Sequence, residues 1–173
     1  MQSSLIDLCN PKKKAFCVLL FLPPLGTCNA SCRLMWLLKM VEAQKTEGGD
    51  GVGWGWAELG TQTQLENALN ITQMKKVSLA VVQWRRGTFW ITQHKKYDFS
   101  SIKKFMRKSF TGTQTGRKSI KDLGSLQGLP SVAICMIWDG ETEDWDLVRL
   151  VSYGATGASL TIFILSICYN LNY

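Results

Sequence analysis

Apolar and polar positions follow a regular pattern mainly in the middle of the chain. Two runs rich in β-branched and aromatic residues, Val77 to Trp84 and Thr88 to His94, flank a short basic loop. This arrangement predicts a β-hairpin. Gly87 is able to adopt the positive φ that a three-residue hairpin loop requires.

The clearest helical spacing follows the hairpin, in YDFSSIKKFMRKSF at residues 97–110. Apolar residues recur there three or four positions apart and cations fill the remaining positions, which predicts a basic amphipathic helix. Asp98 or Ser100 is placed to cap its first turn. The apolar positions are Phe99, Ile102, Phe105, Met106 and Phe110. A shorter helix is predicted before the hairpin around Leu65, Leu69 and Met74.

A continuous apolar run near the N-terminus has several interpretations. Three lysines at 12–14 precede apolar residues 15–22, and the prolines at 23–24 and small residues up to Ala30 follow. This order is typical of a secretory signal peptide, so we predict a leader over residues 1–30, cleaved after Ala30 or Ser31. The alternatives are an uncleaved anchor and a buried core helix. The lysine cluster alone also fits a nuclear-import signal.

The other long apolar stretch is LVSYGATGASLTIFILSICY at residues 150–169, which contains no charged side chain. Its length predicts a single membrane-spanning helix, followed by a polar tail at 170–173. The alternative is that Leu160 to Ile167, rich in β-branched residues, forms a buried strand of a soluble sheet.

Composition divides the chain between these two ends. Residues 32–41 predict a short helix, whereas the glycines of GGDGVGWGWAELG at 48–60 favour a flexible link and a domain boundary. The predicted organisation is a leader (1–30), a short helix with a Gly/Trp-rich linker (31–60), a basic α+β region (61–149) with a buried strand at 131–138 and an acidic turn at 139–146, and a membrane helix (150–169). The fold class is therefore a small, weakly specified α+β fold. Because the local signals disagree from segment to segment, the alternative is a largely irregular chain without a stable fold.

Charge is segregated along the 173 residues, whose formal net charge is +7. Residues 75–121 contain thirteen Lys or Arg and a single acid, Asp98. This excess of cations predicts a partner-binding or lipid-binding surface made of Lys103, Lys104, Arg107, Lys108, Phe105, Trp84 and Trp90. The expected partners are a membrane, anionic lipid or an acidic protein. Nucleic acid is less favoured because no recognised nucleic-acid-binding motif is present.

The sequence lacks the motifs of several common metal-binding and phosphate-binding sites. His94 is the only histidine, so multi-histidine metal sites are ruled out. GTQTGRKS at 112–119 lacks the glycine spacing and the lysine position of a phosphate-binding loop. The acids at 139–146 lack the spacing of a calcium loop. We therefore predict no catalytic, cofactor-binding or metal-binding residues and no enzymatic activity.

The six cysteines form no recognisable framework. Cleavage after Ala30 would remove Cys9, Cys17 and Cys28, which leaves Cys32 and Cys135 as the candidate disulfide pair in an oxidising compartment. Three residues separate Cys28 from Cys32, so the pair is not the redox C-x-x-C motif. Asn70 begins an N-x-T triplet and is a candidate glycosylation site.

Together these patterns predict a small, non-enzymatic, membrane-anchored protein of the secretory pathway that acts as an interaction module through a basic aromatic surface. The first alternative is a soluble basic protein of the nucleus or cytoplasm that binds nucleic acid or acidic partners. The second is the product of a reading frame without a selected function.

Overall fold

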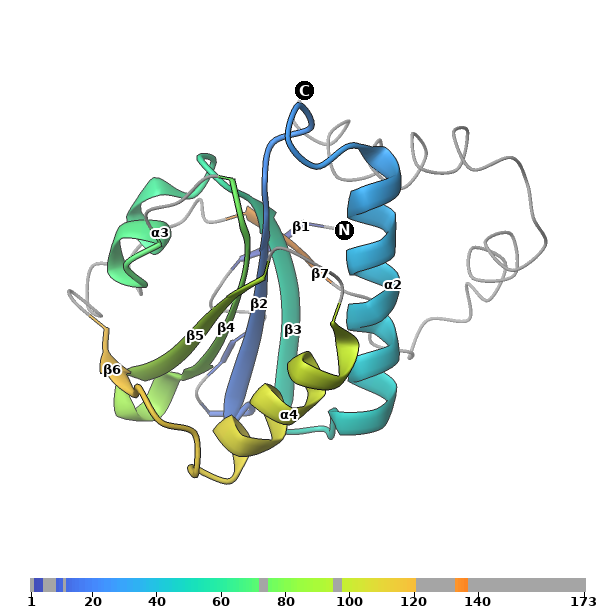
Figure 1. Cartoon of the computed structure of the whole chain (residues 1–173). Coiled ribbons are helices and arrows are strands. Elements are labelled where there is room, and N and C mark those ends of the chain that lie inside the picture. Colours follow the sequence, from blue (N-terminus) through green and yellow to red (C-terminus); the bar gives the residue numbers. More distant parts are fainter. Residues whose placement is uncertain are drawn as a thin grey trace.

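Helices cover both faces of a mixed β-sheet in the described part of the chain (Figure 1). The computed structural model describes residues 2–4, 9–10, 12–71, 75–94, 98–120 and 133–136. The strands are β1 (Gln2–Ser4), β2 (Phe16–Leu22), β3 (Val52–Glu58), β4 (Val77–Gln83), β5 (Thr88–His94), β6 (Lys118–Ser119) and β7 (Ala133–Met136). The helices are α2 (Ala30–Glu47), α3 (Thr63–Ala68), the 3₁₀ turn η1 (Trp84–Arg86) and α4 (Phe99–Phe110).

The seven strands of the described residues lie in the order β1-β7-β3-β2-β4-β5-β6. β2 and β3 are parallel, whereas the other neighbouring strands are antiparallel. Parallel neighbours need a long crossover connection, and α2 provides it. A mixed sheet with helices confirms the α+β class in its general form.

β2 is the central strand of this sheet, paired with β3 on one side and with β4 on the other. Residues Cys17 to Leu22 are all buried, because helices cover both faces of the sheet at this point. A strand buried on both faces has no polar face, so its sequence is a continuous apolar run rather than an alternating one. The segment predicted to be the core of a leader therefore lies in the middle of the folded sheet.

β3 coincides with the segment that was predicted to be a flexible link, and that prediction was wrong for Val52–Glu58. Trp54 and Trp56 lie on the face covered by α2, while Gly53 and Gly55 alternate with them on the other face. Glycine weakens a strand taken alone. Here the pairing with β2 along the whole length of β3 determines the conformation.

The hairpin and the amphipathic helix are confirmed. β4 pairs with β5 from Val77 opposite His94 to Gln83 opposite Thr88, and Gly87 has φ 59° at the turn. α4 begins after Asp98, whose carboxylate accepts a hydrogen bond from the Ser101 N–H. The predicted apolar face of α4 packs on the sheet, with Ile102, Phe105 and Met106 buried.

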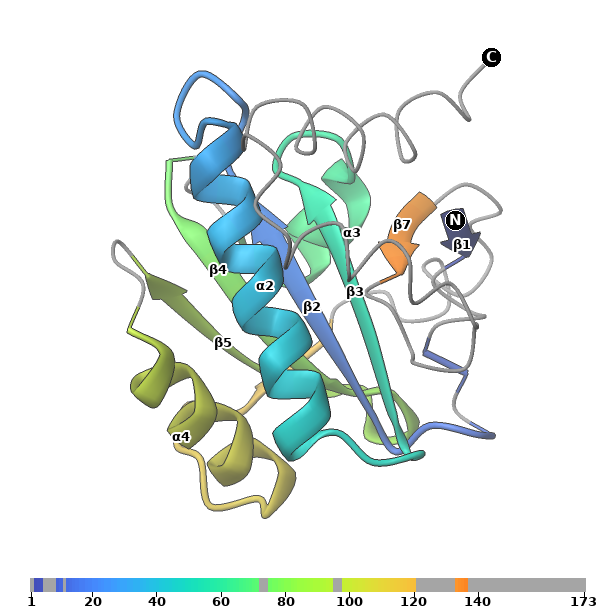
Figure 2. The same cartoon turned by 90° about the vertical axis from the view of Figure 1, so that its right-hand side faces the viewer.

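Two hydrophobic cores lie on opposite faces of the sheet (Figure 2). α2 and α4 pack on one face, with Trp36 and Met40 of α2 buried there. α3 packs on the other face through Leu65, followed by Leu69 just beyond its end. α2 extends beyond the predicted 32–41 because its polar C-terminal residues, AQKTE, are mostly good helix formers.

Several predicted segments lie outside the described residues. These are the membrane helix at 150–169 and the acidic turn at 139–146, which remain predictions. The strand predicted at 131–138 is described over Ala133–Met136, as β7. In the described part of the chain, no helix has both the length and the apolar character that crossing a membrane requires.

Candidate functional site

The predicted basic aromatic surface is not assembled as one patch. Trp84 is buried on the sheet face that α3 covers, whereas Trp90 and Phe105 are buried on the opposite face. The indole N–H of Trp90 donates to the carbonyl oxygen of Gln114 at 3.0 Å. These three rings belong to the cores and offer no stacking surface to a partner.

The predicted cations of α4 divide into two pairs. Arg107 Nε lies 2.6 Å from Glu47 Oε2, and Lys103 Nζ lies 3.8 Å from Glu47 Oε1. Glu47 stands at the C-terminal end of α2, so its carboxylate joins α2 to α4. Lys104 and Lys108 are exposed. Half of the predicted cationic set thus stabilises the packing of two helices.

The pKa of Glu47 is lowered, chiefly by the hydrogen bond from Arg107 and also by the charges of Arg107 and Lys103, against the opposing effect of burial. A carboxyl whose pKa is lowered by folding stabilises the fold fully at pH values above its ordinary pKa of 4.5. This contribution is lost as the pH falls through the pKa of the folded state. Glu47→Gln should therefore flatten the decline in urea-unfolding stability between about pH 6 and about pH 3.

Arg107→Gln should flatten the same decline, because it removes the largest cause of the shift. The two substitutions combined should change the slope no more than Glu47→Gln alone, since that substitution already removes the carboxylate that Arg107 and Lys103 both contact. An unchanged slope in both single variants would contradict the stabilising role of this ion pair.

A denser group of cations lies at the end of the sheet where β2 and β5 begin and β4 ends. It comes from the segment before β2, from the turn of the hairpin and from β6 with the residue before it. Most of these side chains are exposed. We call this group the basic pole, and it comprises Lys12, Lys13, Lys14, Arg85, Arg86, Arg117 and Lys118.

Hydrogen bonds hold the segments of the basic pole together. Arg85 Nη2 donates to the carbonyl oxygen of Lys12 at 3.2 Å, and Arg117 Nη2 donates to Gln83 Oε1 at 2.9 Å. The Arg117 guanidinium also lies 5.0 Å from the ring centre of Trp90. These contacts bring together cations that are more than 60 positions apart in the sequence.

One concave feature adjoins the basic pole. A pocket of about 210 Å³ lies between Lys14 and the C-terminal end of α2, with Gln44, Asp50 and Trp54 in its wall. Lys14 Nζ donates to the carbonyl oxygen of Asp50 at 2.7 Å. An anionic group that entered this pocket would lie close to the Lys14 ammonium.

His94 is half-buried at the end of β5. Its ring lies 6.0 Å from the ring of Trp36, between centres. Burial lowers the pKa of His94, and the charge of Asp98 partly opposes this effect. Among the described residues, no group of His, Cys, Asp or Glu is arranged to hold a metal ion with this imidazole.

A site that the sequence pattern did not predict lies at the opposite end of the sheet, where β2 and β3 end and α2 begins. Arg33 is completely buried there, and its Nη2 lies 2.6 Å from Glu58 Oε2. The same guanidinium donates to the carbonyl oxygens of Pro23 and Cys28, at 2.8 and 3.3 Å. The sequence around Arg33 gives no signal for a buried ion pair, because its partners come from β3 and from the loop after β2.

The described cysteines form two disulfides. Cys32 is bonded to Cys28, and not to Cys135 in β7, while Cys9 is bonded to Cys17. The Cys9–Cys17 bond lies entirely within the predicted leader (residues 1–30), and the Cys28–Cys32 bond crosses its end. Their pairing was not predictable from spacing alone, since six cysteines allow 15 connectivities.

The candidate glycosylation site is exposed. Asn70 follows α3 with φ 54°, a left-handed conformation that asparagine tolerates better than most residues. The position thus meets the accessibility that a glycosylation site needs, while its modification remains a prediction.

No protein-family model matches this chain, and a search of curated proteins finds no match to it.

Proposed function

We propose that this protein is a non-enzymatic interaction module that binds an acidic segment of another protein through the basic pole. The observation that carries this proposal is the gathering of seven Lys and Arg side chains from three separate segments at one end of the sheet. Such a concentration of one charge raises the rate of encounter with an oppositely charged partner.

The surroundings of the basic pole favour an acidic polypeptide over nucleic acid. Single-stranded nucleic acid is usually held by aromatic rings that stack on the bases, together with cations. Trp84 and Trp90, which are the tryptophans nearest to the pole in sequence, are both buried. Cations whose neighbouring tryptophans are buried suit carboxylate groups, which need only ionic and hydrogen-bonding contacts.

A bilayer is also disfavoured as the direct partner of the pole. Membrane-surface sites combine cations with exposed apolar side chains that enter the interface. The large exposed apolar residues of the described chain are Leu25, Met35 and Leu38, which lie in the loop before α2 and on α2 itself. They lie apart from the lysine and arginine side chains of the pole.

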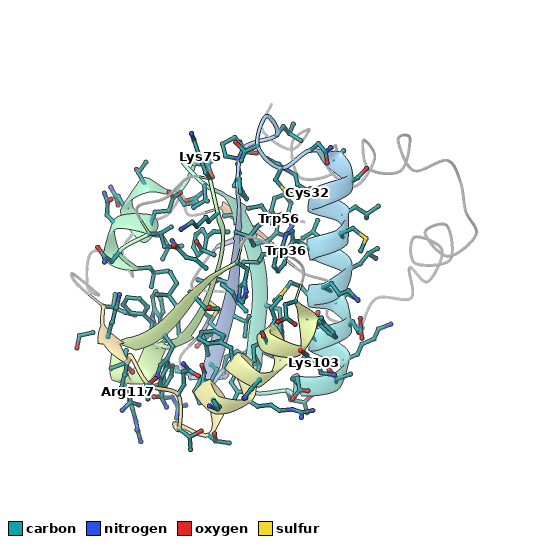
Figure 3. All side chains as sticks on the ribbon, viewed as in Figure 1. Cys32, Trp36, Trp56, Lys75, Lys103 and Arg117 are labelled. Atoms are coloured by element: carbon teal, nitrogen blue, oxygen red, sulfur yellow. A yellow bond between two sulfur atoms is a disulfide. The ribbon has the colours of Figure 1, made fainter. Side chains whose placement is uncertain are left out.

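The proposal is tested with an acidic probe peptide, poly-glutamate, and a pair of charge-matched variants. Lys13→Glu combined with Arg86→Glu should weaken binding at low salt at least about tenfold, because it both removes attraction and adds repulsion within the pole. Lys75→Glu combined with Lys76→Glu makes the same change in net charge at the other end of the sheet (Figure 3 shows Lys75 and Arg117 at opposite ends). This control should keep most of the affinity, measured by fluorescence anisotropy over a range of salt concentrations.

Equal losses in the two double variants would overturn the proposal, since they would show that net charge alone governs binding. Tighter binding of the wild-type chain to single-stranded DNA or to phosphatidylserine vesicles than to poly-glutamate would assign the pole to that other partner class instead.

A further inference from the structure

The Cys28–Cys32 disulfide spans the start of α2, at the opposite end of the sheet from the basic pole (Figure 3 labels Cys32 and Arg117). Asn29 caps the helix, and its side-chain oxygen accepts a hydrogen bond from the Cys32 N–H at 3.0 Å. Cys28 is only 2% exposed, whereas Cys32 in the first helical turn is partly exposed. A reagent from solvent therefore reaches Cys32 more easily than Cys28.

Two features at the start of α2 act on this disulfide. The first is the N-terminal end of α2, whose first turn carries no acidic residue to offset the helix dipole. The second is the buried guanidinium of Arg33, which is paired with Glu58 and also donates from Nε to the carbonyl oxygen of Cys28 at 3.3 Å. Arg33 Nη1 is also buried, and it has no hydrogen-bond partner among the described residues. Both features favour negative charge on a sulfur atom at this place.

We propose that the Cys28–Cys32 disulfide is a redox-active site that exchanges with thiols, either of small molecules such as glutathione or of a dithiol protein. An external thiolate attacks the accessible Cys32 Sγ, so that a mixed disulfide forms there, the Cys28–Cys32 bond breaks and its electron pair leaves on Cys28 Sγ. The N-terminal end of α2, with the N–H groups of Arg33 beside it, stabilises Cys28 as the leaving thiolate, and a better leaving thiolate departs faster.

A second thiolate then completes the reduction. It attacks the external sulfur of the mixed disulfide and releases Cys32 as a thiolate. In total two external thiols are oxidised to one disulfide, and the Cys28–Cys32 disulfide is reduced to two thiols. The reverse sequence oxidises the site again, with an external disulfide as the oxidant.

The Cys9–Cys17 disulfide provides a matched control within the same chain. Both of its cysteines are 1% exposed, and they pack in the core on the face that α3 covers. Cys17 is part of the central strand β2. This bond is shielded from thiolates and lies away from the start of α2, so it acts as a structural crosslink.

The test measures native-state reduction of the two bonds in the full chain. The oxidised protein is exposed to reduced glutathione, the freed thiols are trapped with N-ethylmaleimide, and peptide mapping by mass spectrometry follows each cysteine. We expect Cys28 and Cys32 to be labelled at least about tenfold faster than Cys9 and Cys17. Equal rates, or reduction of Cys28–Cys32 only after denaturation, would overturn the proposal.

The site of attack is tested on the wild-type chain. Mixed disulfides with glutathione that form during partial reduction are trapped with N-ethylmaleimide and located by peptide mapping. The glutathione adduct should lie mainly on Cys32, because Cys28 is the shielded member of the pair. An adduct on Cys28 in equal or greater amount would overturn the assignment of Cys32 as the attacked sulfur. Poly-glutamate binding by the pole does not enter either measurement, so this proposal and the proposed function fail independently.

Discussion

A chain that lacks residues 1–30 should fail to fold. The deletion removes β2, which pairs with β3 over seven residues and with β4 over five. It also removes six consecutive buried side chains, from Cys17 to Leu22. Burial of each large apolar side chain contributes about 1.5–3 kcal/mol, whereas a whole domain is stable by only about 5–15 kcal/mol. Far-UV circular dichroism and urea titration should show no cooperative unfolding transition.

A pair of point variants separates the loss of β2 from the loss of chain length. Leu20→Asp places a carboxylate at a fully buried position of β2 and should also abolish the transition. Leu38→Asp makes the same chemical change at a side chain of α2 that is 40% exposed, and it should leave the transition nearly unchanged. Cooperative unfolding of the truncated chain would mean that the mature fold does not need β2, which is what cleavage of a leader would require.

Arg33→Leu should lower the unfolding free energy by up to about 3–5 kcal/mol, the range seen when one partner of a buried ion pair is removed. Arg33 is fully buried, and the Glu58 side chain is 21% exposed. The Glu58 carboxylate would lose the guanidinium at 2.6 Å, and the carbonyl oxygens of Pro23 and Cys28 would lose their donor. Because Arg33 ties α2 to β3 and to the loop after β2, the effect should appear as a lower urea midpoint with little change in the slope of the transition.

Two comparisons make this expectation specific. Lys39→Leu breaks the exposed Lys39–Glu42 pair on the same helix, at 3.4 Å, and should change stability by less than about 1 kcal/mol. Arg33→Leu combined with Glu58→Leu should recover part of the loss, since no charge is then left without its partner. If Arg33→Leu cost no more than Lys39→Leu, the buried pair would contribute little and the loop would be held by other contacts.

The elements predicted correctly are those whose pattern is complete within a short stretch. α4 carries its cap, its apolar face and its cations within residues 98–110, and the β4–β5 hairpin carries both strands and its turn glycine within residues 77–94. Local propensity and tertiary structure agree in these segments, so the sequence alone was sufficient.

The central strand could not be assigned from its own residues. FCVLLFL is uniformly apolar, and the same pattern is typical of a leader, a buried helix and a strand buried on both faces. Only the neighbours decide among them, and those neighbours, β3 and β4, lie more than 30 positions away. β3 was missed for a related reason, since its glycines weaken the strand signal that Trp54 and Trp56 would otherwise give.

The candidate sites depend even more on long-range proximity. The basic pole combines lysines at 12–14 with arginines of the hairpin turn and with Arg117, whereas the sequence pattern groups only the cations of α4. Similarly, the proposed redox activity of the Cys28–Cys32 disulfide depends on the burial of Arg33 and on the position of α2. The spacing of the two cysteines reveals neither of these features.

The position of β2 also has a consequence for synthesis of the protein. Its two neighbours are made later, because β3 ends at Glu58 and β4 ends at Gln83. Until about 60 further residues have left the ribosome, a strand of high β-propensity and no charge has unsatisfied backbone groups on at least one edge. The nascent chain should therefore depend on chaperone shielding during that interval, and premature release should lead to aggregation through this strand.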